Sequence, residues 1–338
     1  MTDFNNFPLQ LFAGEILNAT TSSATGNNLS AEMKTFYDKT LIALASPYLV
    51  HDQFGQKRDI PKNGGKTIEF RRFSALPKAT TALLEGVTPT GNKLDVSAVT
   101  ATVDQYGDYI QQTDLLELTA VDNTIVEATK QLAAQAGLTL DTIVRNELVG
   151  GTNVMYCPKV SGDTETAVTS RSNLDSTCRL RVKDVFKAAA ELKAMNAPKI
   201  DGYYVGIIHP YVAYDLMQEA GNQWLEVQKY TTPENMLRGE IGCIGGVRFV
   251  ESTEAKIFSG ANGSVFATLV LGADAYGVTS VEGAGLEHIV KQKGYGNDPL
   301  NQRSSIGWKS LKTAKRLVEE YMIRIESCSS IAPNAAAN

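Results

Sequence analysis

Cys243 and His209 are the residues whose types most directly suggest catalysis, because a thiolate and an imidazole that lie close together form a nucleophile and base pair. Cys243 stands among small and apolar residues in the segment GEIGCIGG, residues 239–246, where a lone cysteine acts as a small buried hydrophobe. His209 has no carboxylate or second histidine three or four residues away. The sequence therefore favours core positions for both residues and predicts no catalytic site.

The glycines of the same segment raise the question of a phosphate-binding loop. They fall at Gly239, Gly242, Gly245 and Gly246, which matches neither the spacing G-x-G-x-x-G nor the spacing G-x-x-x-x-G-K-[ST]. A backbone turn that leads into a strand, VRFVES, explains them instead. We expect no nucleotide and no other cofactor.

Metal ligands are also sparse in this sequence. The three histidines lie more than 70 residues apart, and the four cysteines are scattered without a Cys-x-x-Cys pair. The acidic residues contain no calcium-binding loop of the type D-x-[DN]-x-[DN]-G. The sequence predicts no metal site, and its cysteines read as free thiols in a reducing compartment.

Charge is distributed unevenly along the chain, whose formal net charge is -5. Residues 79–128 carry eight acidic residues and one basic residue, whereas residues 291–316 carry seven basic residues and one acidic residue. Neither stretch is the dense basic cluster of a tight DNA-binding protein. We expect them to meet across a subunit boundary, and the candidate contact residues are Glu85, Asp95, Asp104, Asp108, Lys309, Lys312 and Lys315. Alternatively, both stretches face solvent.

Hydrophobic periodicity predicts the elements that position these residues. Amphipathic helices are expected at residues 30–45, 123–148 and 182–197, the third with Val185, Phe186 and Leu192 facing inward. From residue 200 onward, the strands YYVGII, VRFVES and SVFATLVLG alternate with a helix that begins at Pro210. Two further strands occupy residues 306–327. The fold class is therefore α+β.

Two stretches lack the apolar residues needed for a core of their own. The first 30 residues are rich in Asn, Thr, Ser and Gly, and residues 73–99 are rich in Thr, Pro, Gly and Ala. The second stretch is too long for an ordinary connection, and strand-like sequence on both sides of it predicts a projecting hairpin loop. Such segments become ordered on a neighbour, which favours a subunit of an assembly.

The order of elements resembles the major capsid fold of tailed bacteriophages, often called the Hong Kong 97 fold. More specifically, the chain is similar to the family typified by the coliphage N-four head protein. Long phrases carry this resemblance in family order and include SAEMKTFYDKTL (30–41), LLEGVTPTG (83–91), YGDYIQQTDLLELTAVD (106–122), DGYYVGIIHPYVAYDL (201–216), GEIGCIGGVRFVEST (239–253) and DPLNQRSSIGWKS (298–310).

The resemblance implies a division of the chain. It consists of an N-terminal arm (1–50), an extended β loop and its base (51–118), a peripheral domain with a long spine helix (119–199), an axial α/β domain (200–305), peripheral return strands (306–330) and a flexible tail (331–338). The founding member's covalent cross-link has no matching residue pair in this sequence.

The implied function is that of a non-enzymatic shell subunit. It would form hexamers and pentamers of an icosahedral head in the host cytoplasm and become part of the virion. Its partners would be other copies of itself, a portal protein and a separate scaffold or decoration protein, with packaged DNA enclosed but not tightly bound and no membrane contact. The alternatives are an encapsulin-like nanocompartment shell and an α/β enzyme.

Overall fold

The computed structural model describes residues 17–18, 49–73, 76–82, 85–86, 88, 90–115, 124–162, 164–221, 224, 231, 237, 239–282, 285–291 and 293–338. The helix expected at residues 30–45 and most of the expected arm lie outside these residues. The chain divides into two compact units, of which unit 1 comprises Met1–Ala45, Tyr106–Ala136 and Leu286–Ser310, and unit 2 comprises Ser46–Gln105, Gly137–Gly285 and Leu311–Asn338. Helix α3 (Thr124–Val149) and strand β16 (Arg303–Arg316) each run from one unit into the other.

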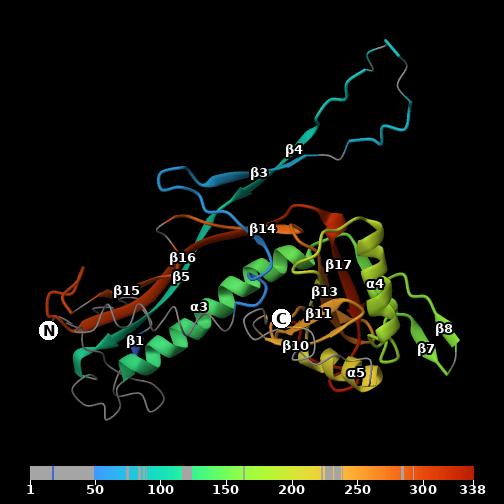
Figure 1. Cartoon of the computed structure of the whole chain (residues 1–338). Coiled ribbons are helices and arrows are strands. Elements are labelled where there is room, and N and C mark those ends of the chain that lie inside the picture. Colours follow the sequence, from blue (N-terminus) through green and yellow to red (C-terminus); the bar gives the residue numbers. More distant parts are fainter. Residues whose placement is uncertain are drawn as a thin grey trace, which may run out of the picture. The chain divides into compact units, whose positions relative to one another are not determined.

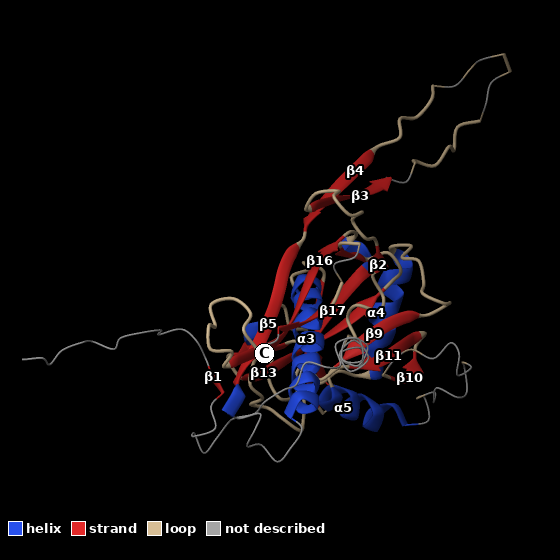
Figure 2. Cartoon of the chain, turned by 90° about the vertical axis from the view of Figure 1, so that its left-hand side faces the viewer, coloured by secondary structure: helices blue, strands red, loops and turns tan. Residues whose placement is uncertain are grey.

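Unit 2 is built on a seven-stranded mixed sheet (Figure 2). The strand order is β10 (Glu240–Ile244), β11 (Val247–Glu251), β9 (Tyr204–Ile208), β13 (Gly263–Leu271), β17 (Met322–Ser327) and β6 (Val154–Tyr156), and β12 (Ile257–Gly260) pairs with β13. Every residue of β9 is buried, as expected of a central strand covered on both faces.

Helices cover both faces of this sheet. Tyr204 and Ile208 of β9 pack in one apolar cluster with helices α4 (Val182–Ala194) and α5 (Pro210–Ala220). Val205 and Ile207, which point to the opposite face, pack with the C-terminal half of α3. The predicted helices at 123–148, at 182–197 and from Pro210 are therefore confirmed within a few residues.

The prediction that Phe186 faces inward is wrong. Phe186 is 50% exposed, because its position next to the buried Val185 rotates it onto the outer side of α4. Its ring instead covers the turn between β10 and β11, where a Cβ on Gly245 would lie 3.3 Å from it.

The extended loop begins and ends in a two-stranded hairpin of unit 2 (Figure 1). Strand β3 (Thr67–Phe73) pairs antiparallel with β4 (Val96–Thr102), from Thr67 opposite Thr102 to Phe73 opposite Val96. All described residues between Leu76 and Asp95 are exposed, as the sequence predicts for a projecting loop. The Phe70 ring of β3 is buried and packs on Gly277 in the rest of unit 2.

Further strands of unit 2 pair around β14. Strand β14 (Tyr276–Ser280) pairs antiparallel with residues 312–316 of β16 and parallel with β2 (Gln56–Lys57). Short elements complete the unit, namely the β7 (Lys159–Ser161) and β8 (Thr164–Thr166) hairpin and the 3₁₀ turns Arg171–Asn173 and Glu319–Tyr321.

The C-terminal tail, expected to be flexible, is bound to unit 2. The carbonyl of Pro333 accepts a hydrogen bond from the backbone N–H of Ser264, and Ala335 packs against the main apolar cluster. Gly263 makes this approach possible, because a Cβ there would lie 2.7 Å from the Pro333 oxygen. The small residues of the tail fit closely against backbone, which hydropathy alone does not reveal.

In unit 1, β5 (Asp104–Thr113), the first half of β16 and β15 (Glu287–Lys291) form a sheet, and β1 (Leu17–Asn18) pairs parallel with β5. Ile306 and Trp308 on one face of β16 pack against Leu132, Ala133 and Ala136 of α3. The opposite face of these three strands carries exposed side chains, among them Tyr109.

Candidate functional site

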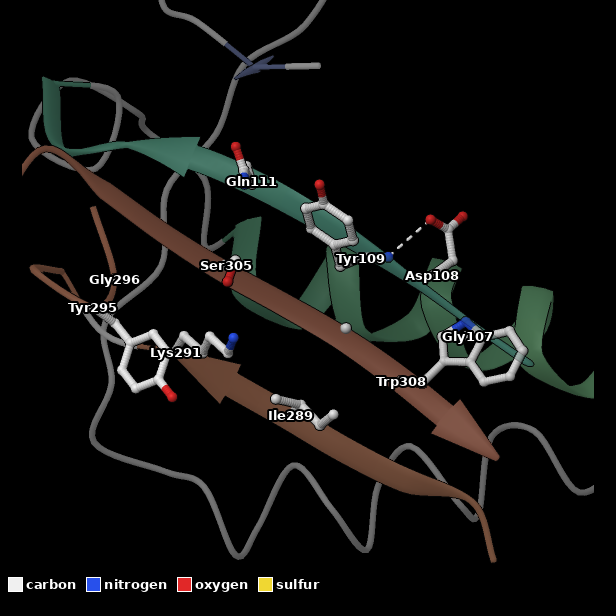
Figure 3. A pocket seen from close by; sticks show the side chains of 11 residues that line it. Gly107, Asp108, Tyr109, Gln111, Ile289, Lys291, Tyr295, Gly296, Ser305 and Trp308 are labelled. Atoms are coloured by element: carbon white, nitrogen blue, oxygen red, sulfur yellow. Dashed lines mark hydrogen bonds between the residues drawn. The ribbon is translucent and has the colours of Figure 1, made fainter. Parts of the chain in front are cut away.

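The sheet face opposite α3 in unit 1 carries a groove of about 560 Å³ across β5, β16 and β15 (Figure 3). Because side chains alternate along a strand, Ser305 and Gly307 point into the groove while Ile306 points toward α3. The register of β15 with β16 places Ile289 opposite Gly307 and Lys291 opposite Ser305. The groove is thus a direct result of strand pairing within this unit.

Two glycines form the floor of the groove. A Cβ on Gly107 would lie 2.5 Å from the backbone oxygen of Trp308, and a Cβ on Gly307 would lie 2.7 Å from the oxygen of Asp108. Only glycine lets β5 and β16 approach so closely. The absence of side chains at both positions also leaves the backbone of the two strands at the bottom of the groove.

Exposed aromatic side chains form its walls. Tyr109 on β5 is 58% exposed and Tyr295, just after β15, is 66% exposed. The Lys291 ammonium lies 4.5 Å from the centre of the Tyr295 ring, a cation–π contact that holds both side chains at one end of the groove. Aromatic side chains of this kind are typical of protein contact surfaces.

Asp108 is tied to its own unit at the groove's edge. Its carboxylate accepts hydrogen bonds from the backbone N–H of Tyr109 at 2.8 Å and from the Gln135 side-chain amide at 2.6 Å. The Gln135 carbonyl in turn accepts a bond from the Trp308 indole N–H at 3.3 Å. This chain of bonds fixes β5, α3 and β16 together beneath the groove.

The other acidic candidates are surface residues. Glu85, Asp95 and Asp104 are exposed, and none of them forms an ion pair with another residue that the structure describes. Glu85 and Asp95 belong to the projecting loop, whereas Asp104 begins β5.

The three lysine candidates already have carboxylate partners within their own chain. Lys309 lies 3.0 Å from Glu287, and Lys315 lies 3.3 Å from Glu147. Lys312 is 8% exposed and its ammonium lies 2.8 Å from Asp52. Lys309 and Lys315 remain partly exposed and accessible to a neighbour, whereas Lys312 is part of the interior of unit 2.

His209 and Cys243 occupy buried positions that serve the fold. His209 caps α5, since its Nδ1 accepts a hydrogen bond from the Tyr211 backbone N–H at 3.2 Å, and burial lowers its pKa to about 4. Burial raises the pKa of the Cys243 thiol, which opposes formation of the nucleophilic thiolate.

Within the described ranges, no cluster of three or more His, Cys, Asp or Glu side chains suits a metal ion. None of the described helices is both long and apolar enough to cross a bilayer.

The sequence did not predict the groove. Tyr109 stands in the alternating stretch DQYGDYIQQT, but Tyr295 and Ile289 come from a segment almost 200 residues away, and nothing local indicates that they meet. The signals present were Gly107 and Gly307 inside strand patterns, since a glycine within a strand often marks close approach of another backbone.

Several solved structures of similar architecture are phage capsids. The chain is similar to the capsid of Ralstonia phage GP4, with 15% identity, a TM-score of 0.68 and coverage of 96% of this chain and 100% of that chain. It is also similar to the capsid of the cyanophage P-SCSP1u (17% identity, TM-score 0.60, coverage 95% and 93%) and the head of Helicobacter pylori bacteriophage KHP40 (13% identity, TM-score 0.55, coverage 97% and 99%). A search of curated protein sequences finds no match.

These likenesses show the fold, which is that of tailed-phage major capsid proteins, the Hong Kong 97 fold. The phage capsid protein family matches residues 50–284, more than two thirds of the sequence, and the chain belongs to that family. It is a structural subunit that associates with copies of itself to form a capsid shell.

Proposed function

We propose that copies of this chain build the icosahedral head shell of a tailed phage and enclose its double-stranded DNA. The observation that carries the proposal is the family match over residues 50–284, on a fold whose exposed loop and open groove need partners. Assembly takes place in the cytoplasm of the bacterial host, and the product is part of the virion. The shell includes a portal protein at one vertex and is helped by a separate scaffold or decoration protein.

Each subunit contributes contact surfaces of complementary character. The projecting loop presents exposed Leu76 and Leu94, with exposed Val96 at the start of β4. The groove of unit 1 presents exposed Tyr109 and Tyr295. Exposed apolar side chains grouped in this way mark surfaces that become buried on association. The proposal is that these surfaces meet counterparts on neighbouring copies.

Charge adds to the proposed contacts. The acidic residues Glu85, Asp95 and Asp104 lack ion-pair partners among the described residues, and Lys309 and Lys315 are partly exposed. Opposite charges across a boundary speed encounter and fix the register of subunits more than they increase affinity. We therefore propose that residues 79–128 of one subunit approach residues 291–316 of the next.

The shell encloses DNA without binding it tightly. With a net charge of -5 and no dense basic cluster, the subunit has few groups for neutralising phosphates. Isolated capsomers should bind DNA weakly at moderate salt in a gel-shift assay. Tight binding with a steep salt dependence would contradict this part of the proposal.

Velocity sedimentation of the purified chain tests assembly itself. Addition of a crowding agent or a divalent salt should convert subunits into species far heavier than a hexamer. A single small species across all protein and salt concentrations would count against a shell.

A further inference from the structure

Strand β4 of the hairpin continues through Val103 directly into β5, whereas β3 follows a short root, residues 49–66, that has little regular structure of its own. Within this root the chain has one two-residue strand, β2, and one isolated bridge between Ile60 and Val281. Val50, Phe54 and Ile60 are buried, so the root lies against the body of unit 2. Backbone hydrogen bonds to β14 hold residues 56–60, including Arg58 N–H to the Val278 oxygen at 3.1 Å and Ile60 N–H to the Ser280 oxygen at 2.9 Å. Residues 51–55, which precede them, are held by side-chain contacts.

The centre of these contacts is a buried pair between His51 and Asp141 of α3. His51 is 1% exposed and Asp141 is 0% exposed. One carboxylate oxygen accepts a hydrogen bond from the His51 backbone N–H at 2.7 Å, and the other lies 2.6 Å from His51 Nδ1. Asp141 thus holds both the backbone and the ring of a single root residue, which fixes its position and its orientation.

Two neighbouring contacts extend the same anchor to other elements. The Tyr276 hydroxyl on β14 donates to the His51 backbone oxygen, and the Tyr276 ring packs against Gly55. Asp52, the next residue along the root, forms an ion pair with Lys312 of β16, whose ammonium lies 2.8 Å from the Asp52 carboxylate. Residues 51–55 are therefore held by one helix and two strands at once.

Because the hairpin is long, a small movement of residues 51–55 produces a large displacement at its far end. Strand β3 has seven residues and extends about 23 Å at roughly 3.3 Å per residue, and the exposed loop continues beyond it. A rotation of about 10° at the root would displace the end of β3 by about 4 Å, more than a hydrogen bond or an apolar contact tolerates. The contacts of the hairpin with the body of unit 2 include Phe70 on Gly277 and the surface pair Arg72 and Glu320.

We propose that His51 and Asp141 form a latch, a positioning device that fixes the direction in which the hairpin leaves unit 2, and that shell assembly depends on it. The consequence for assembly rests on the proposed function, whereas the effect on the root is a property of the single subunit. Asp141 and His51 influence assembly only by fixing the direction of the hairpin, so they are positioning residues.

Hydrogen exchange followed by mass spectrometry tests the latch in the full chain. In Asp141→Ala, the amides of residues 53–60 should exchange at least tenfold faster than in the parent, while those of β9 and β13 stay within twofold. Asp141→Asn should restore much of the protection, because its oxygen can accept from the His51 N–H and its amide can donate to Nδ1. Glu147→Ala is the matched control, since it removes ion pairs with Lys315 and Arg316 from the same helix outside the latch.

A second variant covers the case in which Asp141→Ala does not fold. His51→Leu combined with Asp141→Leu replaces both partners by apolar side chains, which keeps the interior free of an unpaired charge while removing the bonds to the root. Electron micrographs of the folded variants should show misshapen particles or none, under conditions where the Glu147→Ala control forms the parent's particles.

The outcomes separate the two ideas. Unchanged exchange at residues 53–60 in the Asp141 variants would overturn the latch, as would equal acceleration throughout β9 and β13, which would make Asp141 an ordinary core residue. Normal particles from a variant whose root exchanges rapidly would overturn its role in assembly. Failure of the parent to form particles would refute the proposed function, while the exchange data would still decide whether the latch exists.

Discussion

Replacement of His209 by Asn should make the stability of the subunit much less sensitive to mild acid. His209 is 7% exposed at the start of α5, and burial lowers its pKa from 6.5 to about 4. The unfolded chain therefore binds a proton at this residue between pH 6.5 and pH 4 that the folded chain does not bind. The contribution of neutral His209 to the free energy of unfolding is fully present above pH 6.5 and is lost as the pH falls toward 4.

The size of the effect follows from the pKa difference. A shift of one pKa unit corresponds to about 1.4 kcal/mol, so complete titration amounts to about 3 kcal/mol and the part between pH 7 and pH 5 to about 2 kcal/mol. Asn can still accept the hydrogen bond from the Tyr211 N–H, because Asn is a favourable residue at this helix position. The variant therefore loses the titration and retains the cap.

Urea unfolding of both proteins at pH 7 and pH 5 provides the measurement. The carboxylates that titrate below pH 5 are present in both chains, so the difference between parent and variant isolates His209. The parent should lose about 2 kcal/mol more than His209→Asn over this interval. Equal losses in the two proteins would refute the burial argument.

Three further changes test other parts of the account. Gly277→Ala places a Cβ 2.6 Å from the Phe70 ring and should lower the free energy of unfolding by about 1–3 kcal/mol in denaturant titrations, whereas Gly285→Ala, with no atom within 4 Å, should leave it unchanged. Removal of residues 331–338 should lower the melting temperature and cost about 1–3 kcal/mol; an unchanged melting curve would mean that the tail is flexible after all. Lys309→Glu breaks only a half-exposed pair, so subunit stability should change by no more than about 1 kcal/mol while the threshold concentration for assembly rises at low salt; an unchanged threshold would place Lys309 away from any neighbour.

The elements with strong local signals were predictable from the sequence. The helix expected at 123–148 is observed at Thr124–Val149, because a continuous apolar stripe defines it and two glycines follow it. The helix that begins at Pro210 starts there, since proline suits the first turn. The projecting loop was predictable because residues 73–99 cannot form a core.

Features that depend on distant partners were not predictable in this way. Phe186 continues the apolar pattern of α4, yet its ring lies on the outer side of the helix, over the turn at Gly245. The bound tail depends on Ser264 and Gly263, about 70 residues earlier in the sequence. Lys312 looks like a surface base, but its partner Asp52 lies 260 residues away, and only the fold reveals that this pair is internal.

Negative-stain electron microscopy of the expressed full-length chain tests the central claim most directly. A shell subunit should form closed shells, tubes or capsomer rings at moderate protein concentration. A chain that remains monomeric under every condition of salt, pH and concentration would contradict the account.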